Sequence, residues 1–157
     1  MKIERIISGG QSGADQGGLL AGLYLSIPTG GWAPRGWRTE NGPAPWLADY
    51  GVREWSTSDY VGRTRANVEW ADGTVIFGRR SPGSNRTEEI ARQLGRPCLW
   101  INKVFEYGDF VVQPPVPSLV WWLDKHKIRI LNVAGNRESV LPGIRDKVCQ
   151  YLIDNLG

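Results

Sequence analysis

Three short loops combine glycine with hydroxyl, amide and arginine side chains, a composition that suits the binding of a small anion. The loops cover residues 8–13, 78–84 and 134–139. Each follows an apolar run typical of a buried strand and precedes a pattern typical of a helix, so each leads to a helix N-terminus with free backbone N–H groups. Glycine also lets a ligand approach the backbone closely. We therefore expect an anionic ligand to bind at these loops.

Side chains in and beside the loops supply the candidate ligand contacts. Hydroxyls and amides can donate to phosphate, and a guanidinium can pair with it. Asp15 is the acid for which we expect a function, because it directly follows a polar glycine loop, although capping is the default role of an acid in a first helical turn. The candidates in this group are Gly9, Gly10, Gln11, Ser12, Gly13, Asp15, Ser81, Pro82, Gly83, Ser84, Thr87, Asn132, Gly135, Arg137, Glu138 and Ser139.

A second group of candidates lies in a long stretch rich in proline, glycine and tryptophan, residues 32–51. Indole rings stack on flat heterocycles, and neighbouring arginines can hold a phosphate of the same ligand. The same rings can instead fill a small core or an oligomer interface. The candidates here are Trp32, Arg35, Trp37, Arg38 and Thr39.

No pattern indicates a standard catalytic or metal-binding set. The single histidine, His126, lies in a charged turn, and Cys98 and Cys149 are too far apart in sequence to suggest a metal motif or a disulfide framework. The loops lack both the G-x-G-x-x-G and the G-x-x-x-x-G-K-[ST] spacing. Weak catalytic candidates are Asp15 and Glu88, which could act as acid or base on an N-glycosidic bond.

Length and composition restrict the class of protein. The chain has 157 residues, of which 41% are hydrophobic, so we expect one domain over residues 1–157. Its net charge is +3, without a run of basic residues, which argues against a nucleic-acid polymer as partner. Neither a membrane-spanning run nor a secretion signal is visible, so we expect a cytoplasmic protein without a membrane partner.

Hydrophobic patterns predict strands that alternate with helices. The predicted strands cover residues 3–7, 27–31, 52–55, 74–77, 97–101 and 128–133, and the predicted helices 14–25, 59–70, 86–94, 118–125 and 142–156. Residues 103–117 receive no assignment. Alternation of this kind predicts an α/β fold with a parallel sheet covered by helices on both faces. In such a sheet all three glycine loops meet at the carboxyl edge of the strands.

Several segments resemble the molybdenum cofactor carrier family. They are GGQSGADQGG (9–18), IPTGGWAP (27–34), GWRTE (36–40), RT with NV (63–64 and 67–68), SPGS (81–84) and NVAGNRES with PG (132–139 and 142–143). The resemblance implies a Rossmann-like fold related to the LOG and lysine-decarboxylase-like proteins. It also implies a nucleotide-derived or molybdopterin ligand and a homo-oligomer, dimeric or tetrameric.

The LOG signature P-G-G-x-G-T-x-x-E is only partly kept. Pro82, Gly83 and Thr87 match it, whereas Ser84 and Arg86 replace glycines and Ile90 replaces the glutamate. The resemblance therefore favours a carrier of a phosphorylated, heterocycle-bearing small molecule over an enzyme. Two alternatives stay open. One is sequestration of a nucleotide-derived signal such as a cyclic nucleotide or a cyclic ADP-ribose type messenger, and the other is LOG-type hydrolysis of a nucleotide's N-glycosidic bond.

Overall fold

The structure is a computed structural model that describes residues 2–103, 110–112 and 116–157. Its strands are β1 (Arg5–Ser8), β2 (Thr29–Ala33), β3 (Arg38–Thr39), β4 (Gly42–Pro43), β5 (Val52–Glu54), β6 (Gly73–Phe77), β7 (Cys98–Lys103), β8 (Phe110–Val112) and β9 (Ile130–Gly135). Its helices are α1 (Ala14–Leu25), α2 (Tyr60–Trp70), α3 (Pro82–Gln93), α4 (Leu119–Lys125) and α5 (Ile144–Leu156), with a 3₁₀ helix at Pro45–Tyr50.

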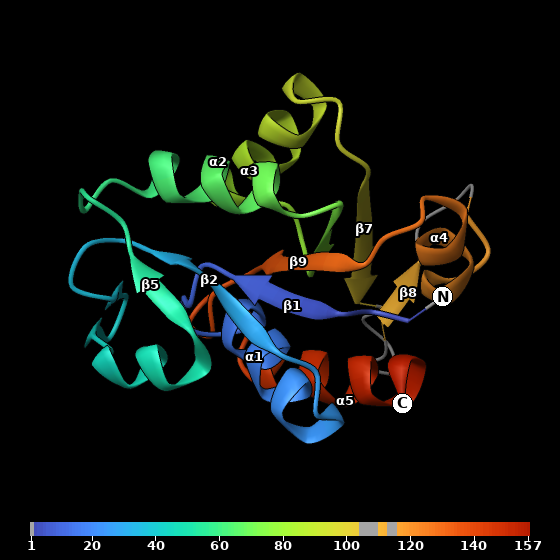
Figure 1. The fold of residues 1–157 in the computed structure, drawn as a ribbon, viewed down its shortest axis with the longest axis horizontal. Coiled ribbons are helices and arrows are strands. Elements are labelled where there is room, and N and C mark those ends of the chain that lie inside the picture. Colours follow the sequence, from blue (N-terminus) through green and yellow to red (C-terminus); the bar gives the residue numbers. More distant parts are fainter. Residues whose placement is uncertain (1, 104–109, 113–115) are drawn as a thin grey trace.

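A seven-stranded sheet forms the centre of the described chain, in the order β5-β2-β1-β9-β6-β7-β8 (Figure 1). All neighbouring strands are parallel except β8, which runs antiparallel to β7. Helices α1 and α5 cover one face, and α2 and α3 cover the other (Figure 1). The predicted α/β, Rossmann-like fold is confirmed.

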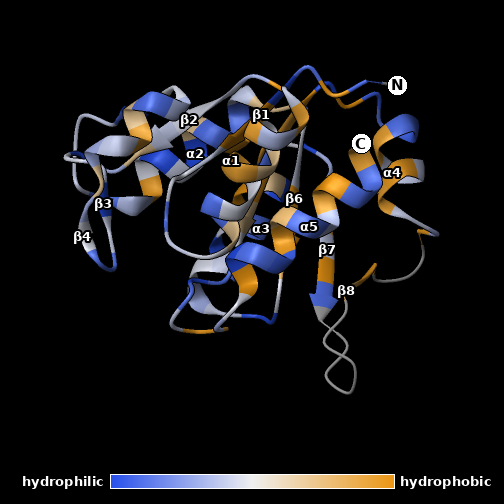
Figure 2. Cartoon of the chain, turned by 90° about the horizontal axis from the view of Figure 1, so that it is seen from below, coloured by the Kyte–Doolittle hydropathy of each residue, from blue (hydrophilic) through white to orange (hydrophobic). Residues whose placement is uncertain are grey.

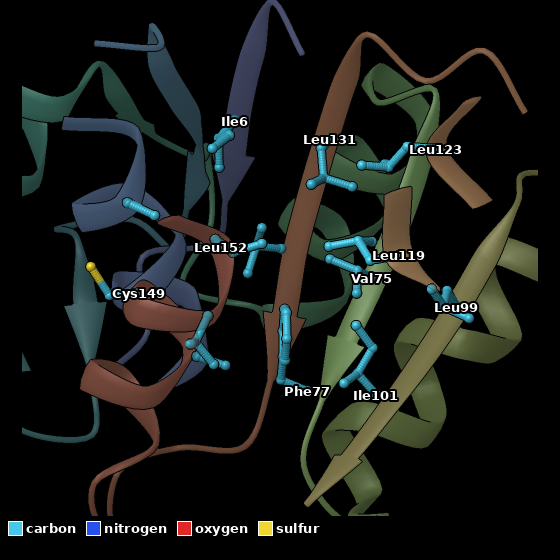
Figure 3. Packing of buried hydrophobic residues seen from close by; sticks show 14 of the residues in the cluster. Ile6, Val75, Phe77, Leu99, Ile101, Leu119, Leu123, Leu131, Cys149 and Leu152 are labelled. Carbon is cyan, nitrogen blue, oxygen red and sulfur yellow. The ribbon is translucent and has the colours of Figure 1, made fainter. Parts of the chain in front are cut away.

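The main core lies between the sheet and the helices α1, α4 and α5. Figure 3 shows Leu152 of α5 pointing toward β9, and Leu119 of α4 beside Val75 of β6. Helix α5 carries hydrophobic as well as hydrophilic residues along its length (Figure 2), as expected for a helix that covers a sheet. This packing holds the carboxyl ends of the central strands in place.

The last strand of the chain lies in the middle of the sheet. β9 pairs with β1 on one side and with β6 on the other, both in parallel. The chain therefore leaves β1 toward β2 on one side, and builds β6 on the other side of β9. Such a reversal of strand order opens a crevice at the carboxyl edge, which is where ligands bind in open α/β sheets. The three glycine loops follow β1, β6 and β9, so they share this edge.

Several elements differ from those predicted. Helix α3 begins at Pro82 rather than near residue 86, because Ser81 caps it and proline is well suited to the first helical position. The β3-β4 hairpin inside residues 32–51 was not predicted. The unassigned stretch 103–117 contributes β8 at the edge of the sheet, and its residues 104–109 and 113–115 lie outside the described residues.

Candidate functional site

A cavity of about 460 Å³ opens at the carboxyl edge of β1, β9 and β6. That volume falls in the range of small-molecule sites. The first glycine loop, α2, the start of α3 and the segment after β9 surround it. Its lining consists of Gly9, Gln11, Asp15, Tyr60, Arg63, Thr64, Asn67, Ser81, Pro82, Gly83, Ser84, Arg86, Thr87, Asn132, Val133, Ala134, Gly135, Arg137, Ser139 and Val140.

The N-terminus of α3 forms one wall of the cavity. The Ser81 hydroxyl accepts a hydrogen bond from the N–H of Ser84 at 3.2 Å, which caps the helix. Gly83 lies in the first turn with open space where a side chain would be. Thr87 is buried one turn later and donates to the Gly83 carbonyl at 3.1 Å. A helix start with hydroxyls and an open glycine favours an anion, because the positive end of the helix dipole faces it.

A charged cluster, in which the Asp15 and Arg63 side chains are largely buried and Arg137 is exposed, forms another wall. Arg63 Nη1 lies 3.7 Å from Asp15 Oδ2, and the Asp15 carboxylate also accepts from the N–H of Gln11 at 3.2 Å. The guanidiniums of Arg63 and Arg137 both lie against the ring of Tyr60, 5.3 and 5.5 Å from its centroid. Two arginines beside one acid give this wall a net positive charge, which favours a ligand with negative charge.

Burial disfavours the ionised form of Asp15 at this position. Burial raises the pKa of Asp15 from 3.8 to about 6, although the charge of Arg63 and the backbone hydrogen bond from Gln11 act in the opposite direction. An acid with a pKa near neutrality in a cavity can exchange a proton with a bound molecule. Of the two catalytic candidates, Asp15 is the one that lines the cavity.

Glu88 lies outside the cavity lining. Its carboxylate accepts from Arg80 Nη1 at 2.8 Å, and the Arg80 guanidinium lies over the ring of Trp100 in β7. Within the residues that the structure describes, His, Cys, Asp and Glu form no group able to hold a metal ion, and Cys98 and Cys149 are free thiols. None of the described helices is both long enough and apolar enough to pass through a membrane.

Four predicted residues of the first and third loops hold the loops in shape and do not line the cavity. Gly10 and Gly13 have positive φ angles of 74° and 81°, and a Cβ at Gly13 would collide with the backbone of the loop after β9. The Ser12 hydroxyl accepts from the N–H of Glu138 at 3.2 Å. The carboxylate of Glu138 in turn accepts from the N–H groups of Gly143 and Arg145, so it caps α5.

Only one of the three helix N-termini faces the cavity with its first turn open. At α1 the N–H of Ala14 donates to the Asn136 carbonyl and that of Gln16 to the Gln11 carbonyl. The start of α5 is capped by Glu138. The expectation that all three loops present free N–H groups to an anion is therefore corrected: first-turn N–H groups of α1 and α5 are bonded within the protein, whereas the first turn of α3 lines the cavity at Gly83, although the N–H of Ser84 there is bonded to Ser81.

The tryptophan-rich segment lies away from the cavity lining. The Trp37 indole donates to the Val52 carbonyl at 2.9 Å and packs on a separate small core. The Trp32 ring packs edge-on against Trp55, with centroids 5.3 Å apart. We expected these rings to stack on a ligand at the site. In the structure both indoles contact other parts of the protein and do not line the cavity.

The polar candidates of that segment are also elsewhere. Arg35 and Arg38 are exposed, and the Thr39 hydroxyl donates to the Gly42 carbonyl at 2.8 Å inside the β3-β4 hairpin. Twelve of the predicted candidates do line the cavity: Gly9, Gln11, Asp15, Ser81, Pro82, Gly83, Ser84, Thr87, Asn132, Gly135, Arg137 and Ser139.

Helix α2 supplies the residues that sequence reasoning missed. Tyr60, Arg63, Thr64 and Asn67 lie on the cavity, and their spacing of i, i+3, i+4 and i+7 places them on one face of the helix. This spacing could have identified these residues from the sequence. A polar stripe on a helix usually faces solvent, however, and here the fold turns it toward the sheet edge. Asn67 fixes the helix there, with its amide bonded to both backbone groups of Trp32 at 2.8 and 2.9 Å.

Comparisons with known proteins agree with this geometry. A crystal structure from Syntrophus aciditrophicus SB, of a protein named "Putative molybdenum carrier protein", superposes with a TM-score of 0.85 at 36% sequence identity, over 99% of this chain and 96% of that chain. A search of the curated proteins finds no match. The model of the circularly permutated YpsA SLOG family matches residues 6–156. The chain therefore belongs to the circularly permutated YpsA SLOG family.

Proposed function

We propose that this cavity binds a phosphorylated, heterocycle-bearing small molecule, nucleotide-derived or a molybdenum cofactor, and that the protein carries it. The observation that supports this most is the pairing of the open α3 N-terminus with Arg63 and Arg137 around one cavity. The dipole and the guanidiniums both favour a phosphate. The carrier role is supported by the name of the relative from Syntrophus aciditrophicus.

The proposed cargo agrees with the size and polarity of the cavity. About 460 Å³ accommodates a nucleotide-sized molecule. The arginine planes against Tyr60 offer flat, charged surfaces to a ring, in place of the indoles first expected. Among the described residues the cavity has donors in excess of acids, since Asp15 is the one carboxylate that they place on its lining.

A substitution at Gly83 tests the anion site without weakening the helix. Gly83→Asp adds a negative charge in the first turn of α3, where an acid stabilises the helix and nothing lies close enough to collide. We expect calorimetry with nucleotides, cyclic dinucleotides, ADP-ribose and molybdopterin to detect binding to the wild type, and at least about tenfold weaker binding to this variant. Gln93→Glu, an exposed change of equal charge at the other end of α3, should bind like the wild type. Equal binding by all three proteins would refute the site.

Two alternatives share this cavity. Sequestration of a nucleotide-derived signal needs the same contacts. It differs from transport in that the molecule is not passed on to an acceptor protein. Hydrolysis of an N-glycosidic bond is favoured by one observation, the buried Asp15 with its raised pKa on the lining. Chromatography of each probe after incubation separates these functions: intact recovery supports carriage or sequestration, whereas base release that Asp15→Asn abolishes supports hydrolysis.

We also propose that the chain forms a homo-oligomer. Trp46 and Trp121 expose 45% and 42% of their surface, and exposed indoles are typical of interfaces. Light scattering after gel filtration gives the mass directly, and a mass of 17.5 kDa would refute the proposal.

A further inference from the structure

The side-chain amide of Gln11 is held in one orientation at the cavity. Its Oε1 accepts hydrogen bonds from two backbone N–H groups, that of Ser12 at 3.0 Å and that of Glu40 at 2.8 Å. Only the oxygen of an amide can accept from N–H donors, so the assignment of oxygen and nitrogen in this side chain follows from its partners. The Nε2 amino group is therefore fixed on the other side.

That amino group is a buried donor without a partner. Gln11 is 6% exposed and lines the cavity, and Nε2 has no hydrogen-bond partner among the described residues. A buried, unsatisfied donor destabilises the folded state unless another group accepts from it. Because Gln11 belongs to the residues that line the cavity, a bound molecule is the candidate source of this acceptor.

The β3-β4 hairpin holds Gln11 in this orientation through Glu40. The Glu40 carboxylate accepts from the hydroxyl of Ser12 and from the hydroxyl and N–H of Ser139, while the Glu40 backbone N–H donates to Gln11. The hairpin is thereby tied to the loops after β1 and β9 at once. Glu40 is on this account a positioning residue, which touches the loops and lies outside the cavity lining.

The distance across the sheet separates this donor from the anion site. β1 and β6 lie on opposite sides of β9, and two interstrand spacings amount to about 10 Å. Gln11 follows β1, whereas the α3 N-terminus follows β6. From this strand spacing we expect a phosphate held by α3 to lie away from Gln11, so that a molecule that contacts both carries a second acceptor.

We propose that Gln11 Nε2 is a specificity-determining donor that binds an acceptor atom on the heterocycle-bearing half of the ligand, such as a ring carbonyl oxygen or an unprotonated ring nitrogen. The inference rests on the proposed function. It adds which part of the ligand is recognised and which atom of the protein recognises it. It excludes a ligand that consists of a phosphate alone.

The variant Gln11→Glu tests the donor directly. A carboxylate keeps an oxygen for the N–H groups of Ser12 and Glu40 and replaces the unpartnered donor by an acceptor. At pH 8 we expect about tenfold weaker binding or more of whichever of GMP, AMP and ADP-ribose binds the wild type, since a hydrogen bond is replaced by repulsion. Inorganic phosphate should lose less than about threefold, because screening weakens a charge that lies further away. The control Gln93→Glu should change neither.

Nuclear magnetic resonance of the wild type gives a second test, which does not depend on the folding of a variant. Titration with the bound nucleotide should shift the Gln11 Nε2–H₂ signals and leave those of Gln93 in place. Unmoved Gln11 signals, or equal losses of nucleotide and phosphate affinity in Gln11→Glu, would overturn the inference. Binding of phosphate but of no nucleotide would overturn it and leave the anion site intact. Binding of no probe at all would overturn the proposed function as well.

Discussion

Replacing Asp15 by asparagine is expected to stabilise the unliganded protein at neutral pH. Burial raises the pKa of Asp15 to about 6, even with Arg63 3.7 Å away. The folded chain therefore holds this proton more tightly than the unfolded chain does. Stability falls as the pH rises from 3.8 through 6, because over that range the unfolded chain releases the proton first. Asparagine has the shape of the protonated acid and cannot ionise.

The size of the effect follows from the same shift. One pKa unit corresponds to about 1.4 kcal/mol, so ionising Asp15 costs about 3 kcal/mol more in the folded chain than in the unfolded chain. We expect Asp15→Asn to exceed the wild type by about that amount at pH 8 and by nothing below about pH 4. In a protein of this size the melting temperature should rise by roughly 6–12 °C at pH 8.

Urea denaturation followed by circular dichroism at a series of pH values measures this difference. The exposed Asp49 provides the control, since Asp49→Asn should change the free energy of unfolding by less than about 0.5 kcal/mol throughout. An Asp15→Asn variant that is less stable at pH 8, or whose difference from the wild type does not vary with pH, would refute the argument that desolvation dominates at Asp15. A stabilised variant that no longer binds its ligand would show that the acid is kept for function at the expense of stability.

Three further predictions concern the loops, the α3 N-terminus and the two cysteines. Glu40→Ala should cost roughly 1–3 kcal/mol in urea denaturation at pH 7. That difference should shrink in acid, because serine hydrogen bonds outweigh desolvation and lower the pKa of Glu40, so protonation removes its contribution. Gly13→Ala should cost more than about 2 kcal/mol, since its φ is positive and its Cβ would collide with backbone; Gly83→Ala, at an open position, should keep the melting temperature within roughly 2 °C. Burial raises the pKa of both thiols, that of Cys98 to about 12, so Cys98 and Cys149 should react slowly with a disulfide reagent at pH 8; fast reaction of the folded protein would contradict their burial.

Local patterns in the chain were sufficient for most of the elements. The apolar spacing of residues 14–25 predicted α1 with its observed bounds, and the helix predicted over 118–125 begins at Ser118, whose hydroxyl caps α4 by accepting from the N–H of Trp121. These features depend on residues within a few positions of each other. The β3-β4 hairpin escaped prediction because strands of two residues have too short a pattern to detect, and the three-residue β8 lies in the stretch that received no assignment.

Part of the cavity lining could also be predicted from the pattern of strands and helices. Loops after parallel strands must meet at one edge, so Asp15, Ser84 and Arg137 were placed together from the alternation of elements alone. The amino-acid sequence could not show that the Glu138 carboxylate caps α5, because an acid near a helix start can either cap that helix or bind a ligand.

The sequence by itself determined that the chain alternates strands and helices and carries glycine loops suited to an anion, since propensity, spacing and turn chemistry are local properties. Only the tertiary structure decided which residues of those loops line the cavity. The insertion of β9 between β1 and β6, the rotation of the polar stripe of α2 toward the cavity and the fixed amide of Gln11 all arise from contacts between distant segments. Such contacts depend on how whole elements pack, and no local pattern records them.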